Sequence, residues 1–467
     1  MRFNILIFLS LLLPITTYSL NGGDSSLAKI GFISPVEIPI SLAGNFGELR
    51  PGHFHAGLDI RTQGKEGLKI RSIYTGYVSR VAISLRGYGK VVYVTHPNGY
   101  TSVYAHLREF NPKLEKFVKD WQYKNHSFEL DLNVDSGRFI FNQGQLIGLS
   151  GNTGGSGGPH LHFEIRNTES ETPINPLHFG FTIQDNLPPS LKTLSVYPLN
   201  ENSAVDGSNK LKTFKLYSKG TNCSLSENRV IRVKGKIGFG IETSDKVVGS
   251  PFTNGVYSIE LLKNNKRVYF HIMDSIRFDE TRFINVHQDY YLTKKYKKKV
   301  QRSYLIEGNK LSIYQGLVNK GQLFFTDSSL YNIEYRITDF HNNQTTFKFK
   351  VKADQENHTS VEPKTANLKM IYGEENYFEN EELKVKIPAN ALYENTDLFI
   401  SKKEAIGRCV TPRYHINSLT DPLHDYITGS INIKNIPEKL RNKLLVVSLD
   451  EKSRILAAEG GEIDSNW

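Results

Sequence analysis

Short runs in which apolar and polar residues alternate are frequent in the first part of the chain and predict β-strands. Residues 76–83 follow this pattern, which is typical of a strand with one buried face. Residues 90–95 and 100–105 flank the turn sequence Pro-Asn-Gly at 97–99. Because Asn-Gly accepts a positive φ, this arrangement predicts a hairpin of two neighbouring strands.

One segment departs from this pattern and predicts a helix. In residues 112–123, Leu114, Phe117, Val118 and Trp121 recur at the spacing of one helix face. We expect this helix to be an insertion on a scaffold of β-sheet.

The length of 467 residues predicts about three domains. Adjacent prolines at 188–189 stop both helices and β-ladders, so we place a boundary there, after a first domain over 20–185. Residues 190–355 carry short β runs and turn signals, and we expect an immunoglobulin-like β-sandwich. Residues 368–467 form a third β-patterned region. No closing strand is evident near its end, and an incomplete last domain is one interpretation.

The composition narrows the class of protein. Hydrophobic residues make up 39% of the chain and charged residues 23%, which argues against a mainly disordered chain. The 24 Tyr and 26 Phe favour strands. The 2 Cys exclude a disulfide framework, a Cys-rich zinc module and an iron–sulfur protein, while a bridge between Cys223 and Cys409 is left open. The formal net charge of +10 is compatible with several anionic partners or with solubility alone.

The N-terminus has the pattern of a secretory signal peptide over residues 1–19. Arg2 precedes an apolar run, Ile5 to Leu13, and small residues allow cleavage before Leu20. The run is too short for an ordinary membrane-spanning helix, although an uncleaved anchor is the alternative. We therefore expect an exported protein of the periplasm, cell envelope or extracellular space. Such a protein has no stable membrane span after cleavage and no nucleic-acid partner.

Residues with metal-binding chemistry are concentrated in the first domain, where eight of the 14 histidines fall between His53 and His178. Three segments carry the candidates: Gly-His-Phe-His-Ala-Gly-Leu-Asp at 52–59, Tyr-Ala-His-Leu at 104–107 and Gly-Pro-His-Leu-His-Phe-Glu at 158–164. Residues two apart on a strand project from the same face, so His160 and His162 reach one cleft together.

These residue types favour a catalytic zinc site. His55 and Asp59 offer a nitrogen and an oxygen ligand, and Gly57 between them allows a tight turn. Two histidines and one carboxylate leave a tetrahedral zinc ion with one open position for water. Zinc lowers the pKa of that water to about 7. Further histidines can then move protons or stabilise an oxyanion.

The three segments together resemble the lysostaphin/LytM-type zinc endopeptidases, which cut peptidoglycan cross-links. The resemblance covers roughly residues 43–180 and lacks none of the family's site positions. It implies an antiparallel β-sheet peptidase domain with Zn²⁺ as cofactor, and hence a mainly β chain with two β-sandwich-like domains after the peptidase. The zinc ligands that it implies are His55, Asp59 and His162. It also implies that His106 and His160 are catalytic, as the residues that activate water or stabilise the transition state.

The resulting hypothesis is an exported zinc metalloendopeptidase that hydrolyses peptide bonds in peptidoglycan cross-links. The alternative is a non-catalytic envelope-binding or activator protein that keeps the fold, because residues 110–143 are long enough to cover a substrate groove. An adhesive β-sandwich protein with a structural zinc is a third interpretation. It is weaker, since structural zinc sites normally use four protein ligands.

Several neighbouring residues have competing interpretations. His53 could replace His55 as a ligand, although the resemblance assigns that role to His55. His96 precedes a turn, and we expect it to cap the turn or to be exposed. Glu164 shares a strand face with His160 and His162, so it either orients a ligand or has a structural role.

Two further segments attract functional interpretations. The glycine-rich residues 148–158 are not followed by Lys-Ser or Lys-Thr, and a strand follows them. We therefore expect them to wall the substrate groove and not to bind phosphate. The basic run Lys294 to Arg302 is either a solvated loop or edge strand guarded by lysines, or a docking site for an anionic envelope polymer.

Overall fold

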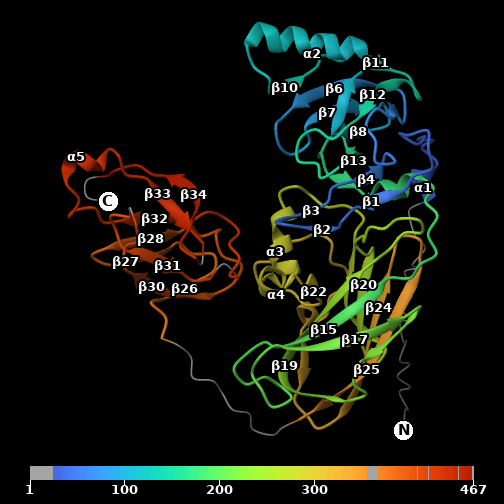
Figure 1. Ribbon diagram of the computed structural model, residues 1–467. Helices are drawn as coiled ribbons and strands as arrows, with labels where there is room; N and C mark the ends of the chain where they lie inside the picture. The colour runs from blue at the N-terminus through green and yellow to red at the C-terminus, as the bar shows by residue number, and fades with distance from the viewer. Residues whose placement is uncertain (1–24, 355–364, 408, 419, 451, 465–466) are drawn as a thin grey trace, which may run out of the picture.

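The computed structural model describes residues 25–354, 365–407, 409–418, 420–450, 452–464 and 467 (Figure 1). The signal peptide predicted for residues 1–19 lies outside this part of the chain. Strands far outnumber helices, so the predicted mainly β fold class is confirmed. In the described ranges, no helix is long and apolar enough to cross a membrane. Cys223 and Cys409 are both free thiols.

The first part of the chain is built on a nine-stranded antiparallel sheet. The main path of this sheet, in spatial order, is β1 (Leu42–Gly44), β4 (Leu58–Arg61), β13 (His160–Asn167), β8 (Tyr100–Ala105), β7 (Lys90–Thr95), β6 (Gly76–Ile83) and β10 (Leu130–Asn133). Two short strands complete it, with β11 (Ile140–Phe141) on β6 and β14 (Pro173–Ile174) on β13. The hairpin predicted around residues 97–99 is confirmed as β7 and β8.

The two faces of this sheet differ in composition. Along β13, Leu161, Phe163 and Ile165 belong to the large buried hydrophobic cluster on one face. Because side chains alternate along a strand, the histidines of β13 lie on the opposite face. That face also carries a small apolar cluster of Val91, Tyr93, Val103 and Ala105.

A smaller sheet and a helix complete this part of the chain. The smaller sheet consists of β5 (Lys69–Arg71), β12 (Leu146–Ser150) and β9 (Leu107–Phe110), and a two-stranded ladder joins β2 (Leu49–Arg50) to β3 (His53–Phe54).

The predicted helix is confirmed as α2 (Pro112–Asn125), which begins after Asn111, whose side chain accepts a hydrogen bond from the amide of Lys113. Leu114 and Val118 of α2 belong to the large hydrophobic cluster, so the helix packs away from the histidine face. A short helix, α1 (Ser25–Ala28), precedes the sheet, and a 3₁₀ turn, η1 (Pro176–Phe179), follows it.

The central part is a connected network of eleven strands. Its members are β15 (Ser190–Pro198), β16 (Ala204–Val205), β17 (Lys212–Lys219), β18 (Asn222–Leu225), β19 (Ile231–Ser244), β20 (Ser258–Lys263), β21 (Lys266–Ile272), β22 (Val300–Arg302), β23 (Leu323–Phe325), β24 (Leu330–Thr338) and β25 (Gln344–Ala353). β25 pairs in parallel with both β18 and β19, so that β19, β15, β17, β18 and β25 form a closed ring of paired strands. The immunoglobulin-like arrangement stays a prediction.

The first and central parts share one hydrophobic cluster. Phe54 of β3 belongs to the same cluster as Phe283 and Val286 of the central part. These two residues lie in η2 (Thr281–Phe283) and α3 (Ile284–His287), which contact β3. The amide of Phe54 donates to Thr281 Oγ1 at 2.9 Å. The segment that carries the first metal-ligand motif is therefore packed directly on the central part.

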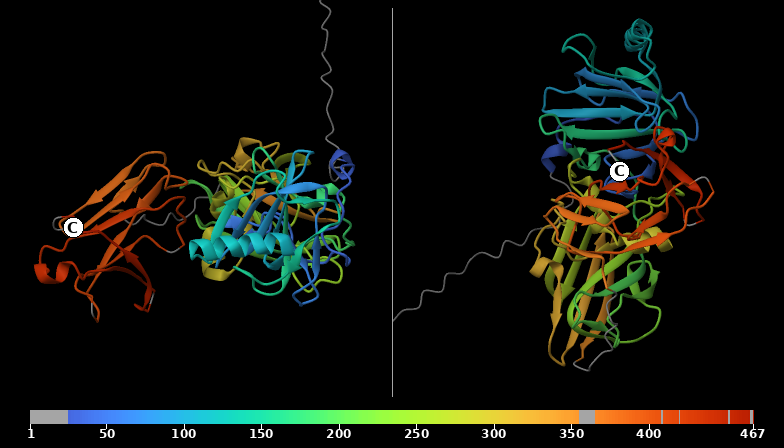
Figure 2. Two further views of the ribbon diagram at one scale, coloured as in Figure 1. Left: turned by 90° about the horizontal axis from the view of Figure 1, so that it is seen from above. Right: turned by 90° about the vertical axis from the view of Figure 1, so that its left-hand side faces the viewer.

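The C-terminal part consists of small sheets and lies to one side of the other two (Figures 1 and 2). Its elements are β26 (Leu368–Met370), β27 (Asn376–Glu379), β28 (Leu383–Ile387), β29 (Thr396–Leu398), β30 (Ile400–Lys403), β31 (Arg413–Ile416), β32 (Thr428–Ile431), α5 (Glu438–Arg441), β33 (Val446–Leu449) and β34 (Ile455–Gly460). Tyr393 contacts the central part, since its hydroxyl donates to the Arg282 carbonyl at 2.9 Å and its carbonyl accepts from the amide of Gly308 at 2.8 Å.

The basic run at residues 294–302 is more ordered than the sequence predicts. Residues 294–296 end the helix α4 (Tyr290–Tyr296), so the expected loop or edge strand is wrong for them. Lys294 and Lys295 lie in the last helical turn, where positive charge is favoured by the helix dipole. The Nζ of Lys299 donates to the carbonyl of Leu49 at 2.7 Å, so this lysine contacts the first part of the chain.

We predict that Phe54→Ala costs about 3–5 kcal/mol of folding free energy, because it opens a cavity in the shared cluster. Phe54 is 3% exposed. Chemical denaturation followed by tryptophan fluorescence measures the loss. The matched control is Phe128→Ala, which truncates a side chain that is 59% exposed. Equal losses in the two variants would contradict the structural importance of the shared cluster.

Candidate active site

Adjacent strands bring the candidate ligands together. β4 and β13 pair antiparallel with Asp59 directly opposite His162, and on the other side of β13 His162 faces Ala105 of β8. His55 lies in the turn between β3 and β4. Gly57 in this turn is required by close approach, since a Cβ there would lie 2.3 Å from the carbonyl oxygen of Phe163.

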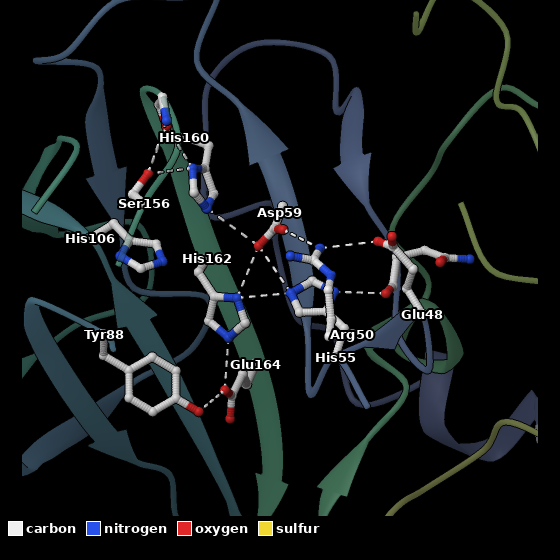
Figure 3. Close-up of polar contacts among 12 residues, drawn as sticks. Glu48, Arg50, His55, Asp59, Tyr88, His106, Ser156, His160, His162 and Glu164 are labelled. Atoms are coloured by element: carbon white, nitrogen blue, oxygen red, sulfur yellow. Dashed lines mark hydrogen bonds and ion pairs between the residues drawn. The ribbon is translucent and has the colours of Figure 1, made fainter. Parts of the chain in front are cut away.

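The ligand atoms of His55, Asp59 and His162 converge on one buried point (Figure 3). Asp59 Oδ1 lies 3.0 Å from His55 Nε2 and 3.0 Å from His162 Nδ1, and these two nitrogens are 3.0 Å apart. Two imidazole nitrogens and one carboxylate oxygen form a donor set that suits zinc and leaves room for a further ligand.

Each candidate ligand is held by a second contact on its outer side. His55 Nδ1 donates to the carbonyl of Asn45 at 2.7 Å, which leaves Nε2 free to bind a metal. His162 Nε2 lies 2.8 Å from Glu164 Oε1, which leaves Nδ1 of His162 free to bind the metal. Arg50 Nη2 donates to Asp59 Oδ2 at 2.8 Å. Such outer contacts fix the orientation of metal ligands, so the residues present fit a metal ion.

The electrostatics of this group are strongly coupled. Burial lowers the pKa of His162, but hydrogen bonds to Asp59 and Glu164 outweigh it and raise the pKa to about 9. Burial raises the pKa of Asp59, but the surrounding histidines hold it well below its usual range. In the absence of a metal ion, protonated His162 therefore carries a proton on Nδ1, the nitrogen that faces Asp59.

The two other predicted site histidines lie beside the ligand group. His106 follows β8 with φ of 58°, at the corner where the chain passes into β9. Its ring centre lies 4.7 Å from that of His160 and 5.9 Å from that of His162. Its Nδ1 donates to the carbonyl of Thr153 at 2.8 Å. Burial and the charges of His162 and His160 lower the pKa of His106 to about 4, so it is neutral at pH 7.

His160 is held from the glycine-rich segment. Its Nδ1 lies 2.8 Å from the carbonyl of Gly158 and 3.1 Å from Ser156 Oγ. Its Nε2 lies 3.4 Å from Asp59 Oδ1. The structure therefore brings all five predicted site residues into one cluster.

The glycine-rich segment packs against another loop. A Cβ on Gly154 would lie 2.3 Å from the amide nitrogen of Gly89, and the amide of Gly155 donates to the carbonyl of Gly87 at 2.8 Å. Close backbone approach between these loops explains Gly154, whose φ is also +73°. The role of residues 148–158 as a wall for substrate stays a prediction.

The competing residues have other surroundings. His53 is exposed, and its Nδ1 lies 3.1 Å from the carbonyl of Pro51, outside the ligand group. Of the two roles expected of His96, exposure is wrong, because its buried ring bonds the Thr75 carbonyl and Ser102 Oγ across neighbouring segments. Its backbone carbonyl accepts from the amide of Gly99 at 3.3 Å, within the turn. Glu164 is fully buried, and its Oε1 lies 2.8 Å from Nε2 of His162; that it orients a metal ligand stays a prediction.

Sequence reasoning missed Arg50, Asn45 and Tyr88. Tyr88 donates to Glu164 Oε1, and its ring centre lies 5.4 Å from that of His162. Arg166 Nε also binds Glu164, at 2.7 Å, which holds the pKa of this carboxyl near 2 although burial acts to raise it. These contacts join residues far apart in the sequence, and no spacing rule identifies them.

A groove of about 420 Å³ extends from Tyr88 across the histidine face of the sheet. Apolar and aromatic side chains of β6 and β7, including Ala82, Val91 and Tyr93, form part of its lining. Glu129 and Asp131 line it at the β10 end, beside Arg80. The segment that follows α2 therefore contributes to the lining of the groove, while the helix itself packs on the other face of the sheet.

Comparisons with known proteins identify this part of the chain. Residues 53–123 and 125–176 match the profile of Peptidase family M23, and residues 367–467 match that of a Zu5-like domain. The resemblance to the lysostaphin/LytM-type enzymes is thus confirmed, and this part is a domain of that peptidase family.

Two curated relatives each match somewhat more than a quarter of the chain. The cell division protein DipM of Caulobacter vibrioides is 29% identical over 125 residues, which is 27% of this chain and 16% of DipM. The DD-carboxypeptidase/endopeptidase Mpg of Neisseria meningitidis serogroup B is 30% identical over 129 residues, or 28% of this chain and 23% of Mpg. The chain thus spans less than a quarter of the length of either relative.

Solved structures align to about a third of the chain. The catalytic domain of lysostaphin from Staphylococcus simulans is 23% identical, with a TM-score of 0.23 and coverage of 34% of this chain and 97% of that domain. A mutant catalytic domain of the prophage-encoded protein EnpA from Enterococcus faecalis is 23% identical, with a TM-score of 0.24. The match covers 32% of this chain and 98% of that domain.

We predict that Arg50→Ala weakens Zn²⁺ binding about 10- to 100-fold, because Asp59 loses the donor that orients its outer oxygen. Competition with a chromophoric chelator measures the affinity. Arg71→Ala is the matched control, since the ion pair that Arg71 forms among the described residues is with the exposed Glu37, at 3.3 Å. Unchanged affinity in Arg50→Ala would show that Asp59 needs no such support.

Metal affinity should fall as the pH falls. Because the pKa of His162 without a metal is about 9, zinc binding below that pH must release a proton. Each further decrease of one pH unit then weakens zinc binding by up to about tenfold. Calorimetry of Zn²⁺ binding in buffers of different ionisation enthalpy counts the released protons. An affinity that stays constant between pH 6.5 and 8.5 is incompatible with a protonated His162 in the metal-free site.

Proposed function

We propose that the protein is an exported zinc metalloendopeptidase that hydrolyses peptide bonds in peptidoglycan cross-links. One observation carries the proposal. The free ligand atoms of His55, Asp59 and His162 meet within 4.8 Å of one another, while the outer atoms of all three side chains are already bonded to protein groups. Two more histidines stand beside this group.

In this proposal, His55 Nε2, Asp59 Oδ1 and His162 Nδ1 hold the zinc ion. When bound, zinc polarises the scissile carbonyl and makes water acidic enough to lose a proton near pH 7. His106 is suited to accept that proton, because it is neutral at pH 7 and its Nδ1–H is held by Thr153, which leaves the Nε2 lone pair available.

His160 has a complementary task. With Nδ1 fixed by Gly158 and Ser156, its ring cannot turn freely, and Nε2 stays near the ligand oxygen of Asp59. Because Nδ1 donates to the carbonyl of Gly158, Nε2 can stabilise the negative charge that develops on the substrate oxygen only when it also carries a proton, beside the carboxylate of Asp59. The proton taken up by His106 then passes to the leaving amine, which completes hydrolysis.

The groove beside Tyr88 supports a peptide substrate. Its apolar and aromatic lining provides contact area, and Arg80, Glu129 and Asp131 provide charged groups at one end. A short peptide with both carboxylate and amino groups, as in a cell-wall cross-link, matches such a mixed lining. The endopeptidase named among the relatives and the cell division protein favour this substrate class and an envelope location.

The basic surface is consistent with that location. The chain carries a formal net charge of +10, and several lysines of α4 and the following residues are exposed. Docking on an anionic envelope polymer through this basic run remains part of the proposal.

The direct test is digestion of purified peptidoglycan by the mature full chain, with and without a chelator. We expect new amine ends that disappear when zinc is removed and return when it is restored. His106→Ala should lower the rate at least about 100-fold without abolishing zinc binding, because it removes the proton acceptor and no ligand. His162→Ala should lose both cleavage and tight zinc binding.

The matched control is His126→Ala, which removes an exposed histidine at the end of α2 and should leave cleavage unchanged. Full zinc binding without any cleavage by the wild-type chain would overturn the enzyme and favour a non-catalytic envelope-binding protein. Chelator-resistant cleavage would overturn the zinc mechanism.

A further inference from the structure

Three carboxylates meet at a second place in the molecule, remote in sequence from the histidine motifs. Asp185 precedes β15, Asp245 follows β19 and Asp339 follows β24. One oxygen of each lies within 4.8 Å of the others. Asp245 and Asp339 are each 3% exposed, and the side chain of Asp185 is 1% exposed.

This cluster has little positive charge to balance it. Among the described residues, no lysine or arginine forms an ion pair with any of the three, and the nearest imidazole nitrogen, Nδ1 of His341, is 3.9 Å from Asp185. Burial and the charges of Asp339 and Asp185 raise the pKa of Asp245 to about 8. Three buried like charges at this separation strongly oppose full ionisation unless a cation joins them.

The hydrogen bonds in the cluster leave one side unsatisfied. Asp339 accepts from the amide and the side chain of Asn343, at 2.9 and 2.7 Å, and Asp185 accepts from the amide of Leu187 at 3.1 Å. Asp245 Oδ1, by contrast, is buried without any partner. An unpaired buried carboxylate oxygen costs free energy, so it indicates a missing partner.

Asn254 supplies an independent observation of the same kind. It is 3% exposed, and neither its Oδ1 nor its Nδ2 has a hydrogen-bond partner. Its backbone pairs with that of Asp245 through two hydrogen bonds, of 3.0 and 2.9 Å. Residues paired in this way project their side chains from the same face of the ladder. The unsatisfied amide therefore lies on the same side as the unsatisfied carboxylate.

We propose that Asp185, Asp245 and Asp339, with the amide oxygen of Asn254, form a divalent-cation site that binds calcium. Calcium prefers oxygen ligands at 2.3–2.6 Å, and three carboxylates and an amide supply them. Two oxygens on one calcium ion are at most about 5 Å apart, which the observed spacing satisfies. Zinc is disfavoured because the cluster offers no sulfur ligand and only one nearby imidazole.

The site is placed to support the active site. Asp245 and Asn254 border a loop whose Ser250 donates to the carbonyl of Leu42 at 2.7 Å. The side chain of Asn45 bonds both the amide and the carbonyl of Gly255, at 2.8 Å each. The carbonyl of Asn45 in turn holds His55. A cation that fixes this loop thereby fixes the contact that orients a histidine of the proposed zinc site.

The experiment is calcium titration of the full mature chain after treatment with a calcium chelator, at pH 7.5, by calorimetry and by thermal unfolding. We expect one calcium ion per chain and a rise in Tm of about 5 °C or more at saturation. Asp245→Asn should weaken calcium binding at least tenfold and abolish the rise in Tm. In the calcium-free state it should unfold no lower than wild type, since an uncharged amide replaces a buried carboxyl whose ionisation the other two carboxylates oppose.

Asp185→Asn is measured alongside, so that misfolding of one variant does not decide the result. Asp279→Asn, which changes an exposed aspartate paired with Arg277, should bind calcium as wild type does. His162→Ala should also keep calcium binding, which separates this proposal from the proposed zinc chemistry. Three results would overturn the proposal: no saturable calcium binding in wild type, calcium binding in Asp245→Asn and Asp185→Asn equal to that of wild type, or a stronger response of His162→Ala to Mg²⁺ or Zn²⁺ than to calcium.

Discussion

The carboxylate of Asp59 connects the two strands and the turn that carry His55 and His162, the candidate metal-binding histidines. Its Oδ1 faces His55 and His162 at 3.0 Å each, and its Oδ2 is held by Arg50 at 2.8 Å. Strand pairing places Asp59 opposite His162, so the ladder between β4 and β13 sets this spacing before any metal binds. The arrangement buries charged and polar groups close together. The outer hydrogen bond of each side chain offsets the free-energy cost of this burial.

The contacts that hold the candidate ligands continue beyond the peptidase domain. His55 donates to the carbonyl of Asn45, and the side chain of Asn45 forms two hydrogen bonds with the backbone of Gly255 in the central part. Phe54, next to His55, is buried in the cluster that both parts share. The turn that carries the first ligand motif is therefore braced by a second domain, which links the rigidity of the site to the packing between domains.

Local sequence patterns predicted the strands and helices well where burial of one face of the element determines its structure. The hairpin at residues 97–99 and the helix at residues 112–125 follow directly from turn chemistry and helical spacing. The resemblance supplied the five site residues, which the structure gathers into one cluster. Sequence patterns failed where tertiary contacts decide: Arg50 reaches Asp59 by folding of the β2–β3 ladder, and His96 is buried by neighbouring segments. The helical end of the basic run was missed because its lysines also fit an exposed loop.

Zinc-edge X-ray absorption of the zinc-loaded chain tests the central claim most directly, because it reports the atoms around the metal. The proposed site predicts two imidazole nitrogens at about 2.0–2.1 Å and one carboxylate oxygen at about 2.0–2.2 Å, with a light fourth ligand from solvent. The imidazole signal should be reduced by half in His55→Ala. A sulfur ligand, or a zinc environment unchanged in His55→Ala, would contradict the claim that these three side chains hold the metal.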